Sequence, residues 1–201
     1  MLNHIRPAIV LFVLLTLLTG VAYPLAMTGA AQALFPSQAN GSLIKKGDHI
    51  IGSSLIGQNF VGAGYFHGRL SATSDTDPND ATKTVSSPYN AANSSGSNLA
   101  PTSKALLDRV AADSATLKAE NPNTPVPAEL VTTSASGLDP HISPDSALFQ
   151  VPRIAHARGL SEMQLRKLIG THTEGRWLGL LGEPVVNVLA LNLALDALRK
   201  P

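Results

Sequence analysis

The longest uninterrupted apolar stretch of the chain lies near its N-terminus, from Ala8 to Met27. No Lys, Arg, Asp or Glu occurs between Arg6 and Lys45. A helix rises about 1.5 Å per residue, so this run reaches about 30 Å, the thickness of a bilayer's hydrocarbon core. The pattern therefore predicts an N-terminal cytoplasmic stub and one transmembrane anchor in residues 1–34.

The charges beside the apolar run predict its orientation. His4, Arg6 and the terminal amine precede the run, and positively charged flanks favour the cytoplasmic side of a membrane. We therefore expect a single-pass membrane protein with a cytoplasmic N-terminus and with residues 35–201 folded as one soluble domain on the opposite, extracytoplasmic side. Three small residues of the anchor are candidates for packing against partner helices: Thr16, Thr19 and Gly20.

A cleaved signal peptide is the alternative interpretation of this N-terminus. Ala31-Gln32-Ala33 has the small-x-small form of a cleavage site. The apolar core of a signal peptide is usually about 7–15 residues long, and the run here is longer. An anchor is therefore favoured, and both interpretations place the rest of the chain outside the cytoplasm.

Helical patterns dominate the soluble part. Thr102 or Ser103 caps a predicted helix whose apolar residues recur at 3.6-residue spacing and which ends at Asn121-Pro122. A second helix is predicted from Ser143, with Pro144 at its first position, to Gly159. Pro152 is expected to kink or divide this second helix.

Strand patterns are fewer and lie far apart in the sequence. Residues 49–55 predict a short strand, and the alternation of Leu189, Leu191, Leu193 and Leu195 suits a strand over 185–195. The stretch from Leu193 onward also fits a helix, so the boundary between strand and helix stays open. Between these two segments, residues 71–97 form a long polar stretch without apolar periodicity, which we interpret as a loop. The expected fold class is α+β, with a small sheet and several helices.

Composition excludes several classes of function. Removing Arg6 from the fifteen Lys and Arg leaves fourteen in the soluble part, against fourteen Asp and Glu. A domain of zero formal charge has no electrostatic footprint for nucleic acid, so we expect no nucleic-acid partner. The chain has no cysteine, which excludes disulfides and thiol nucleophiles.

Two polar clusters are candidate binding segments. The first is Tyr65-Phe66-His67-Gly68-Arg69, in which two aromatic residues lie beside a histidine and an arginine. It forms either a binding surface for an acidic group or a core segment whose arginine is paired locally. Ser94-Ser95-Gly96-Ser97-Asn98 precedes a predicted helix, where backbone N–H groups can bind an anion. No lysine follows in phosphate-loop spacing, so a loop that caps the helix is equally open.

A third cluster, Gly137-Leu138-Asp139-Pro140-His141-Ile142-Ser143, invites a catalytic interpretation. An anchored or secreted hydrolase using Asp139 and His141 is the alternative function. Asp139 before a proline more often forms an Asx-turn, and Ser143 is expected to cap the next helix. The sequence shows neither a nucleophile elbow nor known metal-ligand spacing, so no metal site and no catalytic residue is predicted.

These clusters, in this order behind one anchor, resemble the C subunit of the Kdp-type potassium-transporting ATPase of bacteria. The resemblance covers nearly the whole chain. It is carried by YFHGRLSAT (65–73), SSGSNLAPT (94–102), SGLDPHISP (136–144), QVPRIAHARGL (150–160) and LGEPVVNVLALNLALD (181–196).

The resemblance implies a non-catalytic subunit of an ATP-driven potassium uptake complex. Its expected partners are a channel-like potassium-binding subunit, a P-type ATPase subunit, a small single-span subunit and the lipid bilayer. The family role is that of a catalytic chaperone that raises the ATPase subunit's affinity for ATP. On that interpretation Ser94–Asn98 is the candidate nucleotide-binding segment, with no tightly bound cofactor and with potassium as the transported ion.

The predicted topology conflicts with a direct nucleotide site. It places the soluble domain outside the cell membrane, whereas ATP is inside. A domain on the outer side can still act on the ATPase by stabilising one state of a two-state assembly. We give the topology more weight, since charge and span length bear on it directly.

Overall fold

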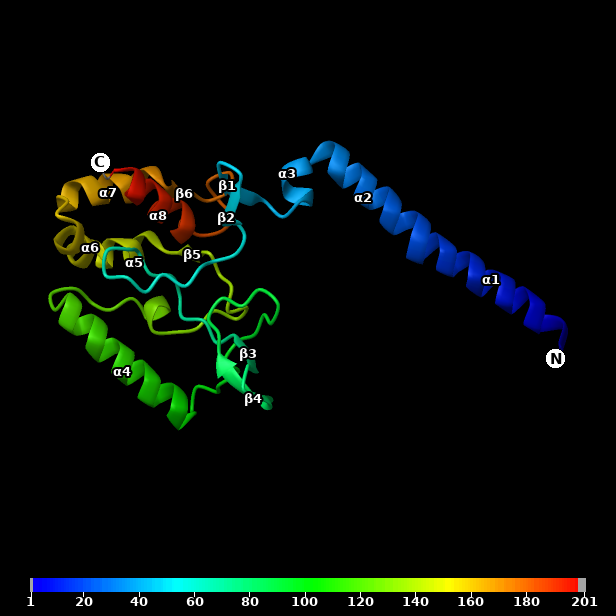
Figure 1. Ribbon diagram of the computed structural model, residues 1–201, viewed down its shortest axis with the longest axis horizontal. Coiled ribbons are helices and arrows are strands. Elements are labelled where there is room, and N and C mark those ends of the chain that lie inside the picture. The colour runs from blue at the N-terminus through cyan, green and yellow to red at the C-terminus, as the bar shows by residue number, and fades with distance from the viewer. Residues whose placement is uncertain (1, 199–201) are drawn as a thin grey trace. The chain divides into compact units, whose positions relative to one another are not determined.

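The computed structural model describes residues 2–198 (Figure 1). The chain divides into two compact units, one ending at Ile51 and the other beginning at Gly52. We call these the N-terminal unit and the soluble unit. Their mixture of helices with small antiparallel sheets confirms the expected α+β class.

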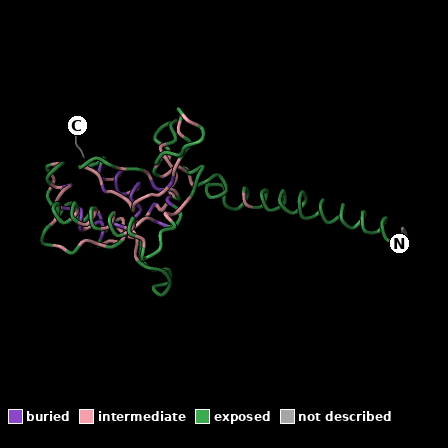
Figure 2. Tube along the Cα trace, turned by 90° about the horizontal axis from the view of Figure 1, so that it is seen from below, coloured by how far each residue is buried: buried purple, intermediate pink, exposed green. Residues whose placement is uncertain are grey.

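The N-terminal unit is dominated by one long helix. It consists of α1 (Ile5–Leu17), a π-helical turn (Leu18–Ala22) and α2 (Tyr23–Leu34), preceded by a 3-10 turn at Leu2–His4. Of residues 2–198, only Ile5–Leu34 forms a helix long and apolar enough to cross a membrane, and none of its apolar window is buried (Figure 2). The predicted apolar helix is therefore confirmed as a candidate span.

The π-helical turn has a local cause. Proline at position 24 lacks a backbone N–H, and its ring displaces the carbonyl one turn earlier, so the helix widens just before it. The Thr19 hydroxyl donates a hydrogen bond to the Leu15 carbonyl at 2.7 Å, which satisfies that hydroxyl within the helix. The segment stays helical through Leu34, because Pro24 occupies the start of α2.

One short helix and a hairpin follow α2. The helix α3 (Pro36–Ala39) precedes β1 (Leu43–Lys46) and β2 (His49–Ser53), which pair as a two-stranded sheet. The turn between the strands uses Gly47 at φ +61°, a conformation that favours glycine. The strand expected at 49–55 is confirmed, whereas its partner β1 was not predicted, because its lysines hide any apolar alternation.

A three-stranded antiparallel sheet lies at the centre of the soluble unit. Its order is β5 (His141–Ile142), β7 (Val185–Asn187), β6 (Thr173–Glu174). The helix α8 (Val188–Ala197) starts directly after β7, and the Asn187 side chain caps it by accepting from the Ala190 N–H at 3.0 Å. The strand expected over 185–195 is therefore correct only for Val185–Asn187. The alternating leucines belong to α8, which buries Leu189, Leu191 and Leu195, so the expectation of a strand there was wrong.

Three helices between β5 and β6 complete the body. They are α5 (Pro144–Phe149), α6 (Val151–Arg158) and α7 (Glu162–Thr171). The predicted division near Pro152 occurs at Gln150, and Gly159 ends α6 in the left-handed region at φ +67°. Ser161 and Gln164 form the capping box that starts α7.

The core lies between the helices and the three-stranded sheet. Figure 2 shows the buried residues gathered in the soluble unit, with exposed segments around them. Its members come from the segment at Phe66, from β5 and β7, and from α5 to α8: Phe66, Ile142, Ala147, Val151, Ile154, Leu165, Ile169, Val186, Val188, Leu191 and Leu195.

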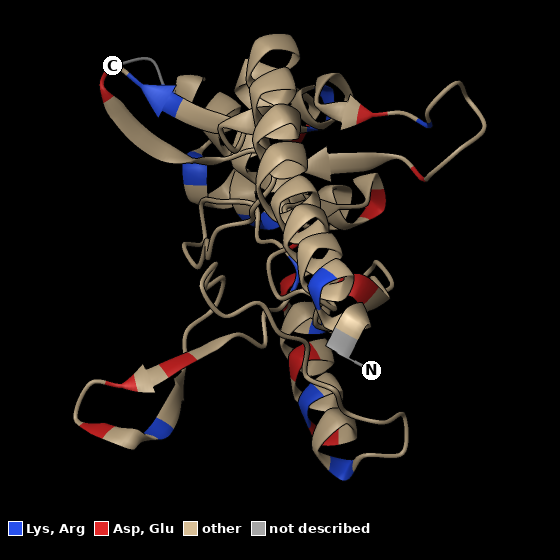
Figure 3. Cartoon of the chain, turned by 90° about the vertical axis from the view of Figure 1, so that its right-hand side faces the viewer, with Lys and Arg blue, Asp and Glu red and all other residues tan. Residues whose placement is uncertain are grey.

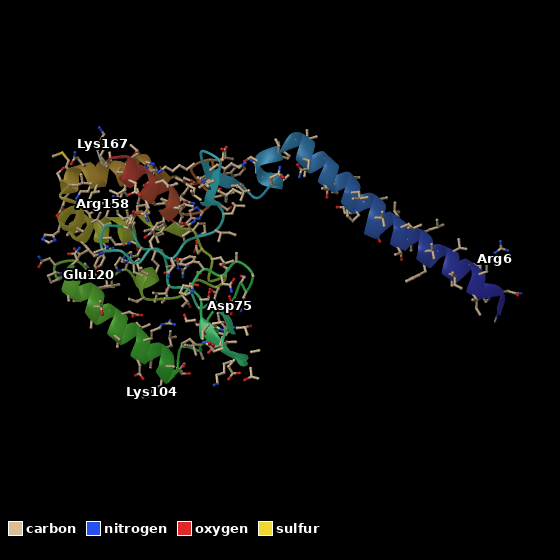
Figure 4. The ribbon with its side chains drawn as sticks, in the orientation of Figure 1. Arg6, Asp75, Lys104, Glu120, Arg158 and Lys167 are labelled. Carbon is tan, nitrogen blue, oxygen red and sulfur yellow. The ribbon has the colours of Figure 1, made fainter. Side chains whose placement is uncertain are left out.

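The stretch predicted as a long loop at 71–97 contains a polar hairpin. Strands β3 (Ser74–Asp77) and β4 (Asp80–Ser86) pair antiparallel, with a bulge between Thr76 and Asp77. Acidic and basic residues line this hairpin (Figure 3), and Asp75 lies on it (Figure 4). Because neither face covers a core, the strands carry no apolar alternation, and a strand could not be predicted from the pattern.

The helix α4 (Lys104–Glu120) confirms the helix predicted after Ser103, and Figure 4 shows Lys104 and Glu120 at its two ends. Ser103 is the N-cap, but its side chain makes no capping hydrogen bond. None of the residues of α4 is fully buried, in contrast to α5–α8. A 3-10 turn, Ala128–Leu130, and irregular chain lead from α4 to β5.

Candidate functional site

The segment 65–67 is held by side-chain amides in place of a neighbouring strand. The Asn192 amide accepts from the Phe66 N–H and donates to the Phe66 carbonyl, both at 2.9 Å. Gln150 does the same for His67, at 2.8 Å for the N–H and 3.0 Å for the carbonyl. Both amides are buried, so each backbone group is paired away from water.

Tyr65 lies on the exposed side of this segment and packs against a basic side chain. The Arg158 guanidinium lies 4.4 Å from the centre of the Tyr65 ring and 2.8 Å from the Asp196 carboxylate. The Tyr65 hydroxyl donates to the same carboxylate at 3.3 Å. Phe66 points the other way and is fully buried in the core. Phe66 therefore contributes to the core, whereas Tyr65 contacts Arg158 and Asp196 near the surface.

His67 is held in its neutral form. Burial, followed by the positive charge of Arg153, lowers its pKa below the ordinary value of 6.5. Its ring nitrogen Nε2 lies 3.0 Å from the Gly62 carbonyl, which fixes the imidazole. Arg153 itself donates to the Ala63 carbonyl at 2.6 Å and lies 3.1 Å from Glu120 of α4.

Arg69 joins two of the predicted clusters. Its guanidinium lies 3.3 Å from the Asp139 carboxylate and donates to the Thr133 carbonyl at 3.2 Å. The Tyr89 hydroxyl donates to the Arg69 carbonyl at 2.6 Å. Burial, followed by the negative charge of Asp139, raises the pKa of Tyr89 to about 12, so this hydroxyl stays a donor at neutral pH.

Hydroxyl groups extend the same junction to the hairpin stem. The Ser71 hydroxyl donates to the Gly137 carbonyl at 2.8 Å and accepts from the Tyr89 N–H at 2.9 Å. The Thr73 hydroxyl donates to the Ser87 carbonyl at 2.6 Å. Hydrogen bonds thus join three segments of the chain, at residues 71–73, 87–89 and 137.

Two glycines of the predicted clusters are needed for close backbone approach. Gly137 has φ +69°, and a Cβ there would lie 2.7 Å from the Ser95 carbonyl oxygen. A Cβ on Gly96 would lie 2.8 Å from the Ala135 carbonyl oxygen. The Ser95 N–H donates to the Ser136 carbonyl at 2.9 Å, so the two loops run in direct contact.

In the candidate nucleotide segment, Ser94–Asn98, two serine hydroxyls form hydrogen bonds with the loop at residues 133–136. The Ser94 hydroxyl donates to the Ser136 carbonyl at 2.9 Å, and the Ser97 hydroxyl lies 3.2 Å from that of Thr133. The segment ends before the Ser103 N-cap, so its N–H groups are not those of the first helical turn. It carries no Lys or Arg. These residues fit an internal junction and not a phosphate cradle, and nucleotide binding here stays a prediction.

Asp139 and His141 form a turn in place of a catalytic pair. One Asp139 oxygen accepts from the His141 N–H at 3.0 Å, the expected Asx-turn, and the other faces Arg69. The Pro140 carbonyl accepts from the Val188 N–H, and Ser143 caps α5 by accepting from the Ser146 N–H at 3.2 Å. Among residues 2–198, no group of three or more His, Asp or Glu is placed to hold a metal ion.

Four residues of the site were not singled out from the sequence. They are Gln150 and Asn192, which clamp the segment 65–67, and Arg153 and Arg158, which hold its flanks. The signal available was weak but present, since a polar residue such as Asn192 within an otherwise apolar run is costly to bury unless it is paired.

Comparison with known proteins covers the whole length of the chain. A family model described as "K+-transporting ATPase, c chain" matches residues 5–197. A protein of Rhodopseudomonas palustris (strain BisB5), named potassium-transporting ATPase KdpC subunit, is 69% identical over 98% of both chains. Proteins of the same name from Methylorubrum extorquens and Bradyrhizobium diazoefficiens are 66% and 67% identical, over 100% and 98% of both chains. The resemblance seen in the motifs is thereby confirmed, and this chain belongs to the KdpC family.

Proposed function

We propose that this chain is a non-catalytic subunit of an ATP-driven potassium uptake complex, which stabilises the assembly and supports its P-type ATPase subunit. Membership of the KdpC family makes it an accessory chain of a potassium-transporting ATPase and not the catalytic one. The observation that carries the structural part of the proposal is the junction between the family motifs. Arg69 pairs with Asp139, and the Ser71 hydroxyl donates to the Gly137 carbonyl. These polar groups therefore stabilise the fold.

The hydrolase alternative has no support from this geometry. A general base needs a free lone pair directed at a substrate proton. Asp139 accepts from the His141 backbone N–H and pairs with Arg69, so its carboxylate stabilises the turn and the positive charge of a neighbouring segment. The named relatives are transport subunits, which removes the remaining reason to treat the pair as catalytic.

The proposed partners are a channel-like potassium-binding subunit, the P-type ATPase subunit and a small single-span subunit. Contact within the bilayer is proposed through the anchor, where Thr16, Thr19 and Gly20 present small side chains. A Cβ added at Gly20 meets no atom of this chain within 4 Å, so a partner helix has room to approach. The proposed location is the bacterial inner membrane, with a cytoplasmic N-terminus and a periplasmic soluble unit.

The proposed effect on ATP affinity is indirect. A subunit that binds one state of the assembly better than another shifts the population toward that state, and the ATPase subunit's affinity shifts with it. Such coupling is typically worth about 5- to 150-fold in affinity. This route needs no nucleotide at Ser94–Asn98, whose polar groups are already used within the soluble unit.

Reconstitution of the complex with and without this chain tests the proposal. We expect the complex lacking it to assemble poorly, or to show an apparent KM for ATP raised by about 5-fold or more. Co-purification, ATPase kinetics and potassium uptake are the measurements. Normal assembly, normal KM and normal uptake without the chain would overturn the proposal.

Calorimetric titration of the full-length chain with ATP separates the indirect route from direct binding. We expect no saturable heat. Saturable binding that is lost in N98D, beside unchanged binding in T84A on the hairpin, would establish a nucleotide site at Ser94–Asn98 and overturn the indirect route. The accessory role itself would survive that outcome.

A further inference from the structure

One loop of the soluble unit exposes a contiguous apolar cluster. It connects β6 to β7 and consists of Trp177, Leu178, Gly179, Leu180 and Leu181, which we call the tryptophan loop. The four large side chains are 67%, 75%, 81% and 61% exposed, in chain order. Single exposed apolar residues are normal on protein surfaces, whereas a contiguous group of this kind marks a contact site.

The tryptophan loop is a preformed structure. Backbone N–H groups at Trp177, Gly179, Leu180 and Leu181 all donate within the loop or to its base, at 2.8–3.1 Å. Leu178 and Gly179 take positive φ values of +52° and +75°, which turn the chain sharply at the tip. The loop therefore presents apolar side chains while these four donors stay satisfied, the condition that a lipid environment imposes.

Charge is confined to the base of the loop. Residues 177–182 contain no ionisable side chain. Arg176 and Glu183 flank them and pair with each other at 2.7 Å. Figure 3 shows this as an uncharged loop that projects between one blue and one red position. A protein interface is ordinarily ringed by polar groups free to bind the partner, whereas here the nearest charges neutralise each other.

The length of the connecting segment limits how far the soluble unit can lie from a bilayer that holds the anchor. Residues 35–51 join the anchor to the soluble unit, and even fully extended they reach no more than about 60 Å. Their α3 helix and β1–β2 hairpin shorten that reach further. Tryptophan and leucine are the residues that favour the membrane–water interface and the outer acyl region.

We propose that the tryptophan loop inserts into the lipid surface and forms a second membrane contact, separate from the anchor. Trp177 lies at the headgroup level, and the three leucines reach the acyl boundary. This contact fixes the orientation of the soluble unit above the bilayer. The inference depends on the anchor and not on the proposed role in potassium uptake.

The chain supplies its own probe for this contact, because Trp177 is its only tryptophan. The full-length chain is reconstituted into vesicles of phosphatidylcholine and phosphatidylglycerol, with and without brominated acyl chains. We expect blue-shifted emission and quenching by bromolipid. The matched control carries W177F with T84W, which moves the indole to the exposed β3–β4 hairpin, and we expect its quenching to be at least about twofold weaker.

A second variant tests the leucines without removing the probe. L180S with L181S changes only exposed side chains, so the melting temperature should stay within a degree or two of the parent. Bromolipid quenching of Trp177 should fall toward the level of the hairpin control. Solvent-like emission and equal quenching in all three proteins would overturn the proposal.

The assembled complex distinguishes lipid from a protein occupant. The chain has no cysteine, so L180C can be labelled at one position with an environment-sensitive dye. Quenching of the dye by spin-labelled lipid in the purified complex supports the proposal. A dye shielded from water but untouched by spin-labelled lipid would show that a partner subunit covers the loop, and would also overturn it.

Discussion

Individual residues decide how the segment 65–67 is held. Among the described residues no strand pairs with its backbone, so Asn192 and Gln150 supply the donors and acceptors that a sheet would supply elsewhere. A buried backbone group without a partner costs about 1–3 kcal/mol. Each amide satisfies two such groups, and each therefore carries more stability than one polar side chain usually does.

Replacing Asn192 with leucine should be strongly destabilising. N192L keeps the branched side-chain shape but leaves the Phe66 N–H and carbonyl unpaired in the core, so we expect a loss of about 2–5 kcal/mol. Urea unfolding of the full-length chain in detergent measures it. The control N93A removes an exposed amide that also bonds to backbone, and should cost less than about 1 kcal/mol. Equal effects of the two changes would contradict the clamp.

Acid should destabilise the soluble unit through His67. Its folded-state pKa is lowered, so below pH 6.5 the unfolded chain takes up the proton more readily than the folded chain. Stability is therefore present above 6.5 and is lost as the pH falls below it. Thermal melting from about pH 7.5 to about pH 5.5 should show this fall, and H67Q should reduce it.

The exposed His49 provides the control for this pH effect. H49Q should leave the pH dependence of melting as it is in the parent. A parent whose melting temperature is flat across this range, or an H67Q chain with the same slope as the parent, would contradict the role of His67.

At the scale of elements, the helices differ sharply in how they are packed. The last helix, α8, buries Val188, Leu189, Leu191, Asn192 and Leu195, whereas α4 buries none of its residues fully. Burial, and not helix propensity, supplies most helical stability in a protein. The two helices therefore make different contributions to the fold, although the sequence predicts α4 more clearly.

A pair of leucine truncations tests this difference. L191A removes a fully buried side chain and should cost about 2–5 kcal/mol, through lost burial and the cavity left behind. L107A on α4 removes a side chain that is 58% exposed and should cost less than about 1 kcal/mol. Chemical denaturation of the two variants compares them directly, and similar costs would mean that α4 is packed as firmly as α8.

Local signals account for the elements that the sequence predicted well. The Ser161–Gln164 capping box, the division near Pro152 and the left-handed Gly159 all depend on neighbouring residues only. The β3–β4 hairpin escaped prediction because its exposed strands carry no apolar alternation. The boundary between β7 and α8 escaped it because β7 pairs with β5, which is distant in sequence.

The candidate site divides in the same way. The Asp139 turn and the Ser143 cap follow from local residue order and were predicted. The Asn192 and Gln150 amides and the Arg69 guanidinium contact residues at least 70 positions away in the sequence. No local sequence pattern could therefore predict these contacts. The family resemblance marked the right segments but said nothing of which side chains meet.

For the whole molecule, the proposed topology is open to a direct test. With no native cysteine, N3C marks the N-terminus and T84C marks the exposed hairpin. In intact spheroplasts, a membrane-impermeant maleimide should label T84C fully and N3C only after permeabilisation. The reverse pattern would place the soluble unit in the cytoplasm, beside ATP.

The clamp on Phe66 joins residues 126 positions apart, and this separation has a consequence during synthesis. A ribosome makes the chain from its N-terminus, so Asn192 leaves the exit tunnel long after Phe66. Until then the segment 65–67 lacks the partner that completes its pairing. A stop codon before position 192 therefore produces a chain with a complete anchor and an unfinished fold. We expect such a product to be degraded as an unfolded chain.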